Sequence, residues 1–201
     1  MKYAIALGFL LLVAGSVVHA QEPRPPGVNT AVEATAGNSA LQLRYLAPSP
    51  WAATTGRSDL DYGFLLTQNR NIIGSAALMF HTNLHILPNL TIDVGPKGYL
   101  ALLSDVNKTD IFAVAFGVDA RYVVLPRWGI AAFGSAFYSP TVLTFGQGDN
   151  VYDFTAGADI PFTSRLSGLA GYRWFKLTTI AEPDIVVQRE VFAGLRWKLK
   201  G

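Results

Sequence analysis

Cysteine is absent from the 201 residues, and the chain has only three histidines. Disulfides therefore cannot stabilise the fold, and no cysteine follows the first apolar run to carry a lipid anchor. Beyond that first run, no apolar stretch reaches the roughly 20 residues that a membrane-spanning helix needs. These absences exclude a disulfide scaffold and a helical membrane protein.

An excess of charge of one sign is also lacking. The chain has 16 Lys and Arg against 14 Asp and Glu. Without Lys2, which lies in a segment that we expect to be removed, 16 − 1 = 15 basic residues remain against 14 acidic ones. The near-balance gives no sign of a nucleic-acid partner.

The amino terminus reads MKYAIALGFLLLVAGSVVHA. It combines a basic start at Lys2, an apolar run to Val18, and small residues ahead of a cleavage point after Ala20. This pattern predicts a secretory signal peptide over residues 1–20. Residues 21–30 form a Pro-rich leader without periodicity, and the folded part is expected to be 31–201.

Half of the residues are hydrophobic, yet in the exported part they occur at every second position. Near the carboxyl terminus Val191, Leu195 and Trp197 share one strand face, whereas Arg196 and Lys198 lie on the other. Apolar content without helical spans, on an exported chain, favours an all-β transmembrane antiparallel up-and-down β-barrel of the bacterial outer membrane.

Ten strands are predicted, with eight as the alternative if the first two segments form one bent strand. The segment at 128–138 is apolar on both faces, so its orientation stays open. Short turns alternate with longer loops, which predicts periplasmic turns, periplasmic termini, and external loops at 138–150 and 178–188 where an outside partner would bind. The predicted strands are 31–36, 40–47, 59–67, 71–82, 89–103, 110–124, 128–138, 151–161, 165–177 and the carboxyl-terminal segment from about 189.

The alternation also assigns side chains to lipid or lumen. Seven aromatic residues are predicted to face lipid: Phe112, Phe116, Tyr122, Tyr152, Phe154, Trp174 and Trp197. The acidic lumen residues are Glu33, Asp59, Asp61, Asp93, Asp119, Asp153, Asp159 and Glu190. The basic lumen residues are Arg44, Lys97, Arg121, Arg165, Arg173, Arg196 and Lys198.

Three cross-strand charge pairs are predicted inside the barrel. Hairpin geometry sets Asp93 opposite Arg121 and Asp153 opposite Arg173, and closure of the barrel brings Glu33 towards Arg196. A lumen of paired charges favours a closed polar plug or a narrow passive pathway, because an ion-selective pore needs a ring of one sign.

Two other functions stay open. A lipid-modifying barrel enzyme would need a nucleophile and a base, and His81, on the predicted lumen face near the periplasmic rim, is its candidate base. A soluble periplasmic β-sandwich or lipocalin-like binder is the other. No catalytic, cofactor-binding or metal-binding residue is predicted, so the expectation is a protein without enzymatic activity.

One stretch, residues 137–177, resembles the YfaZ family of bacterial outer-membrane proteins. Its most specific parts are Tyr138-Ser139-Pro140 and Gly171-Tyr172-Arg173, with further likeness in the signal peptide, in VGPKGYLAL at 94–102 and in the last strand. The resemblance implies an outer-membrane barrel of unassigned biochemical role. The partners it implies are outer-membrane lipid and the barrel-assembly machinery, with the oligomeric state left open.

Overall fold

The computed structural model describes residues 30–50, 58–82, 89–104, 110–179 and 185–199. The predicted signal peptide, the leader up to residue 29, His85, and the middle of the loop at 178–188 lie outside the described residues. In the described part, no helix is long and apolar enough to cross a membrane.

Ten strands build the barrel, as the alternation predicted, and the eight-strand alternative is wrong. Residues 31–37 and 40–48 form a hairpin of two strands because the turn at 38–39 reverses the chain. The barrel strands are β1 (Ala31–Gly37), β2 (Ala40–Pro48), β3 (Ser58–Thr67), β4 (Ile72–Thr82), β5 (Leu90–Leu102), β6 (Asp110–Leu125), β7 (Ile130–Ser139), β9 (Gly148–Pro161), β10 (Leu166–Thr179) and β11 (Ile185–Lys198).

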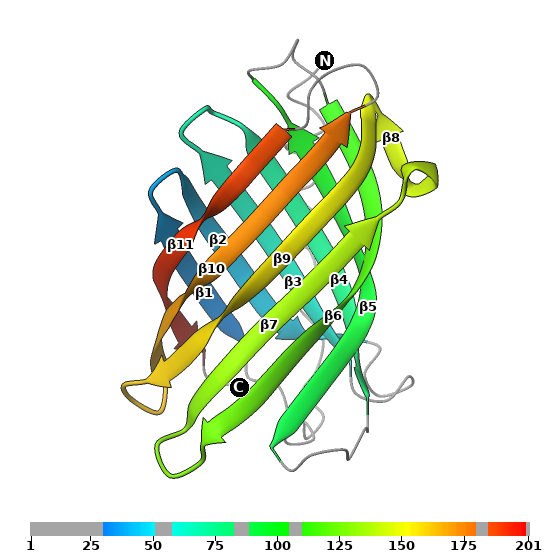
Figure 1. The fold of residues 1–201 in the computed structure, drawn as a ribbon. Coiled ribbons are helices and arrows are strands. Elements are labelled where there is room, and N and C mark those ends of the chain that lie inside the picture. The colour runs from blue at the N-terminus through cyan, green and yellow to red at the C-terminus, as the bar shows by residue number, and fades with distance from the viewer. Residues whose placement is uncertain (1–29, 51–57, 83–88, 105–109, 180–184, 200–201) are drawn as a thin grey trace.

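Each barrel strand pairs antiparallel with the next, and β1 pairs with β11 to complete the ring (Figure 1). A short 3-10 turn, η1 (Thr141–Leu143), and a three-residue strand, β8 (Thr144–Gly146), lie in the connection from β7 to β9. β8 adds to the end of β6 without entering the ring. One sheet closing on itself is incompatible with the β-sandwich alternative.

Each rim of the barrel has both short and longer connections, since residues 38–39 alone join β1 to β2 at the upper rim and residues 49–57 join β2 to β3 at the lower rim. The lower rim of Figure 1 carries the short turns 126–129 and 162–165 and the outer ends of β1 and β11. The opposite, upper rim carries η1 and β8. At the lower rim Gly129 has a φ of 68°, a left-handed conformation that glycine adopts without a steric penalty.

The outer face of the barrel is apolar, because outward and inward side chains alternate along each strand. Large hydrophobic side chains remain exposed around the ring, among them Leu43 on β2, Phe64 on β3 and Phe116 on β6. In water such a surface would be unfavourable, whereas a bilayer solvates it. The architecture is that of a transmembrane barrel.

Inside, the lumen has two layers. The upper half is filled largely by apolar side chains, and this set is called the lumen seal from here on. Phe175 and Val151 are 0% exposed, and Ile111 and Leu177 are 1% exposed. The lumen seal comprises Leu65, Ile73, Tyr99, Ala101, Ile111, Ala113, Phe137, Val151, Phe175 and Leu177. The charged residues lie below the lumen seal, towards the lower rim.

The segment 128–138, whose orientation the sequence left open, directs Phe133 and Phe137 inward. These two residues stand opposite Gly157 and Asp153 of β9.

Candidate functional site: a charge-paired lumen

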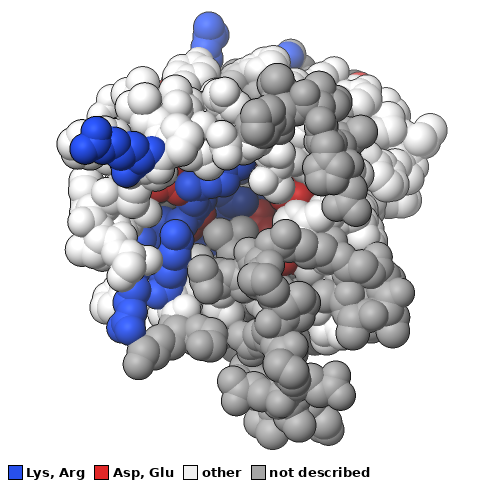
Figure 2. Space-filling model, turned by 90° about the horizontal axis from the view of Figure 1, so that it is seen from below, with Lys and Arg blue, Asp and Glu red and all other residues white. Residues whose placement is uncertain are grey.

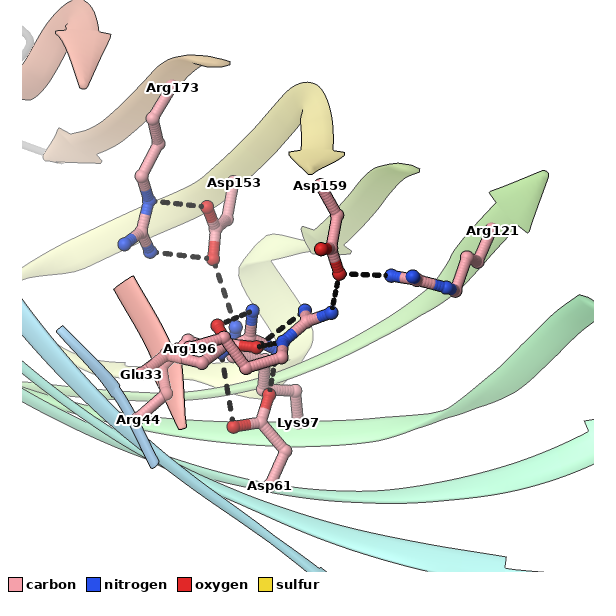
Figure 3. Close-up of polar contacts among 9 residues, drawn as sticks. All are labelled: Glu33, Arg44, Asp61, Lys97, Arg121, Asp153, Asp159, Arg173 and Arg196. Atoms are coloured by element: carbon pink, nitrogen blue, oxygen red, sulfur yellow. Dashed lines mark hydrogen bonds and ion pairs between the residues drawn. The ribbon is translucent and has the colours of Figure 1, made fainter. Parts of the chain in front are cut away.

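A chain of ion pairs with alternating sign begins on β3 and runs along the inner wall (Figure 3). Arg44 on β2 contacts Asp61 on β3, with 2.6 Å between Nη2 and Oδ2. It also contacts Glu33 on β1, with 3.3 Å between Nη1 and Oε2. Glu33 accepts a hydrogen bond of 2.6 Å from Nε of Arg196 on β11. Each carboxylate thus lies next to a guanidinium of a neighbouring strand.

The same chain continues past β11. Arg196 donates to Asp159 on β9, and the same oxygen of Asp159 accepts a 2.7 Å hydrogen bond from Arg121 on β6. Neither contact joins neighbouring strands, since β10 separates Arg196 from Asp159 and β7 separates Asp159 from Arg121. The long side chains of Arg196 and Arg121 therefore each reach over an intervening strand on the inner wall. In order, the chain is Asp61, Arg44, Glu33, Arg196, Asp159 and Arg121.

Asp153 on β9 is the centre of a second cluster. Arg173 on β10 donates to both of its oxygens, from Nε and Nη2, at 3.1 Å each. Lys97 and Tyr99, both on β5, donate to Oδ2 at 3.1 Å and 2.7 Å. Four charge-assisted hydrogen bonds on a carboxylate that is 1% exposed compensate its desolvation.

Lys97 also shows how the bore is filled. Its strand, β5, and that of Asp153, β9, are separated in the ring by β6 and β7, so the pair reaches across the interior. The ammonium lies 4.7 Å from the ring centroid of Phe137 and 5.1 Å from that of Tyr99. This cation is held by a carboxylate and two aromatic faces at the boundary between the charged layer and the lumen seal.

The structure places the three predicted pairs as follows. Glu33 and Arg196 are opposite in register and bonded. Asp153 and Arg173 are bonded diagonally, since Arg173 stands opposite Thr155 and Asp153 opposite Phe175.

The predicted pair between Asp93 and Arg121 is not formed. Opposed residues of β5 and β6 sum to 212, because Asp93 stands opposite Asp119, whereas the predicted pair required a sum of 214. The centre of the turn lies one residue earlier than the pattern suggested, so the register of the two strands shifts by two residues. A two-residue shift keeps every side chain on its face and changes only its partner. Arg121 binds Asp159 instead.

Asp93 belongs to a third cluster, near the lower rim, with His81. Nδ1 of His81 contacts Asp93, and Nε2 lies 2.9 Å from Asp59. Both ring nitrogens therefore face carboxylates, so neither is directed at a hydroxyl nucleophile. The two carboxylates hold the imidazole of His81 in place, and neither ring nitrogen is positioned as the base that acyl transfer would need.

One other lumen assignment changes. Arg165 lies in the exposed turn at the lower rim, where it does not line the bore. Glu190 keeps its inward position, opposite Arg173. It accepts a hydrogen bond from the backbone of Ser39 near the upper rim and one from Gln188, so it ties β11 to the first hairpin.

The residues predicted to face lipid lie on the outer face. Three of them, Tyr152, Phe154 and Trp174, form a stack on β9 and β10, which Tyr138 of β7 extends. Trp197 lies at the lower rim, as does Trp128. The rest of the predicted set, Phe112, Phe116 and Tyr122, is exposed along β6.

The lumen seal was not predicted from the sequence. Alternation placed polar residues on the inward faces of the segments that it could orient, but Ile73, Phe137 and Phe175 point inward and are buried. The signal was present in 128–138, which is apolar on both faces, and in 71–82 and 165–177, where the alternation is less regular. Such a segment has an inward face that packs against other side chains.

Figure 2 shows the lower mouth, where Lys and Arg side chains lie beside Asp and Glu side chains inside the ring. The charged layer is thus visible from the lower side. In contrast, the apolar layer above it is closed to solvent at Phe175 and Val151. The lumen is polar at one end and sealed at the other.

No protein-family model matches the chain, and no curated protein matches it. Among solved structures it is similar to a bacterial polysaccharide outer membrane secretin (TM-score 0.46, 13% identity, 83% of this chain and 58% of that one). It is also similar to the outer membrane channel DcaP of Acinetobacter baumannii (TM-score 0.43, 8% identity, 88% of this chain and 60% of that one). A third similar structure is the KdgM porin in complex with disordered oligogalacturonate (TM-score 0.43, 12% identity, 86% of this chain and 100% of that one). The chain spans less than two thirds of the first two. The fold assignment rests on the strand pairing of the chain itself.

Proposed function

We propose that this protein is a small structural barrel of the bacterial outer membrane whose lumen is closed at rest. The observation that carries the proposal is the lumen seal. Phe175, Val151, Ile111 and Leu177 meet inside the upper half with no more than 1% of each side chain exposed. Hydrophobic constrictions of this kind exclude water and ions.

The charges below the seal support the same function. They alternate in sign from residue to residue, and no ring of one sign lines the described lumen. In the chain from Asp61 to Arg121 and in the cluster around Asp153, each charge contacts a partner of opposite sign, so removing a partner is costly and rearrangement is opposed. The network braces strands that are far apart in sequence, such as β1, β6 and β9.

The outer membrane is proposed as the location on two grounds. The outward band is apolar with aromatic residues near both rims, and the amino terminus carries a predicted signal peptide. Insertion would require the barrel-assembly machinery. Membership of the YfaZ family, which the motifs at 138–140 and 171–173 suggest, is part of this proposal.

A planar-bilayer recording tests the closed lumen. The wild type, with insertion confirmed separately, is expected to give no current steps. The variant Phe175→Ala/Leu177→Ala removes much of the seal and is expected to give reproducible steps. Phe154→Ala/Trp174→Ala, which truncates outward residues on β9 and β10, is the matched control and should be silent.

A narrow passive pore is the second candidate, favoured by the charged mouth that opens at the lower rim (Figure 2). In that case the wild type conducts, and Arg173→Ala changes the size of the steps because Arg173 lines the bore. If the wild type gives current steps and Arg173→Ala changes their size, the protein is a narrow passive pore and not a closed structural barrel.

A further inference from the structure

Two basic side chains lie on the otherwise apolar outer face. Among the described strand residues, Lys176 and Arg189 are the basic ones whose positions alternate outward. Arg189 on β11 stands opposite Trp174 on β10, and Lys176 follows two residues later on the same face of β10, towards the upper rim. Arg189 is exposed and has no hydrogen bond or ion pair with a described residue.

The height of Arg189 identifies its surroundings. Trp197, exposed on the same strand near the lower rim, is 197 − 189 = 8 residues away. At about 3.3 Å per residue and a tilt of about 40°, this separation is roughly 20 Å along the membrane normal. The apolar band of a transmembrane barrel is about 25 Å tall between its aromatic girdles. With Trp197 in the lower girdle, Arg189 lies at the upper boundary, at the level of lipid headgroups.

A hollow adjoins Arg189 on this surface. It has a volume of about 560 Å³ and is lined by Phe154, Ala156, Tyr172, Trp174 and Arg189, among others. Ala156 contributes only a methyl group between the larger side chains of Phe154 and Tyr172, which leaves the space open. The row of Ala156 and Tyr172 lies one step below that of Phe154 and Trp174, towards the membrane centre. The hollow thus leads from a cation into the hydrocarbon layer.

On the basis of the proposed membrane location, we propose that Arg189 and the hollow beside it bind an anionic membrane lipid. The guanidinium of Arg189 takes the phosphate of the headgroup, and an acyl chain lies over Ala156 between Trp174 and Tyr172. Charge complementarity selects the anionic headgroup, because an unpaired cation at the membrane surface attracts negative lipid. The apolar walls match the chain.

Bromine quenching of tryptophan fluorescence tests the site. The full chain is refolded into phosphatidylcholine vesicles that contain a minor fraction of phosphatidylglycerol, with bromine on the acyl chains of one lipid or the other. Heat-modifiable migration on gels first confirms insertion. The difference between the wild type and Trp174→Phe isolates the signal of Trp174.

Brominated phosphatidylglycerol is expected to quench Trp174 more than its share of the lipid predicts. Arg189→Gln should lower this preference about fivefold, since one cation near the surface contributes about 1 kcal/mol. Arg189→Lys should keep it. Arg165→Gln, which removes an exposed arginine at the opposite rim, is the matched control and should also keep it.

Equal preference in the wild type and Arg189→Gln would overturn the lipid site while leaving the barrel intact. Quenching by neither lipid, together with cross-linked dimers, would overturn it in favour of a second copy of the chain on this face. Failure of every variant and of the wild type to insert would overturn the membrane barrel itself, and with it the site.

Discussion

Arg173 on β10 donates to both carboxylate oxygens of Asp153 on β9, at 3.1 Å each, although the two residues are not opposite in register. Side-chain exposure is 6% for Arg173 and 2% for Asp153. Breaking a buried pair leaves an uncompensated charge, so Arg173→Ala should lower the free energy of unfolding by about 3–5 kcal/mol. Urea unfolding in vesicles, followed by heat-modifiable migration, measures the change.

Removing the other partner should cost more. Asp153→Asn leaves two cations, Arg173 and Lys97, without their shared carboxylate, so its loss of stability should exceed that of Arg173→Ala. Arg165→Ala in the exposed lower turn is the control and should change the free energy of unfolding by less than about 0.5 kcal/mol. Equal, small effects for all three variants would contradict the structural role of the cluster.

The register of β5 and β6 makes a second prediction. Ile92 stands opposite Ala120 in the structure, whereas the register inferred from the sequence would put it opposite Tyr122. The chain contains no cysteine, so an introduced pair is the only source of an internal disulfide. Oxidation should therefore cross-link Ile92→Cys/Ala120→Cys and leave Ile92→Cys/Tyr122→Cys reduced, because only directly opposed Cβ atoms approach bonding distance. Gel mobility without reductant reads out both pairs.

Phe116 lies on the outer face of β6, six residues from the upper end of a 16-residue strand, and is 58% exposed. An arginine at mid-membrane depth on the lipid face costs about 2–4 kcal/mol, and near the interface about 0–1 kcal/mol. Phe116→Arg should therefore reduce the yield of assembled barrel strongly, and Trp128→Arg, in the lower turn, only slightly. Normal assembly of Phe116→Arg would show that this face does not meet hydrocarbon. Phe116→Leu is the apolar control.

His81 lies between the carboxylates of Asp59 and Asp93. His81→Ala removes the hydrogen bond to Asp93 and the close contact with Asp59, and it leaves two carboxylates near each other, which should cost about 1–3 kcal/mol. His81→Gln keeps one amide donor group and should cost less. Because both ring nitrogens are occupied, vesicle lipids incubated with the wild type should be unchanged by mass spectrometry. A lipid product made by the wild type and lost in His81→Ala would instead identify a lipid-modifying enzyme.

The fold could be read from the sequence because the alternation of side chains is local. Strand β6, for example, shows its outward face in Phe112, Val114 and Phe116, and no knowledge of its neighbours is needed to see it. The ten strands follow from such segments and from the turns between them, whereas β9 and β11 begin three and about four residues earlier than predicted. Charged lumen residues such as Glu33 and Arg44 were identified in the same way, since their position in the strand gives the face.

What the sequence could not supply was the partner of each inward side chain. Arg121 reaches Asp159 past β7, and Lys97 reaches Asp153 across the bore, because long side chains on a closed ring meet residues far away along the sheet. Those contacts depend on curvature and on register, where a two-residue shift keeps each side chain on its face and exchanges one partner for another. The division of the lumen into an apolar seal and a charged layer arises likewise only when ten strands converge. Local pattern determined the faces of the strands, and closure of the barrel determined what each face meets.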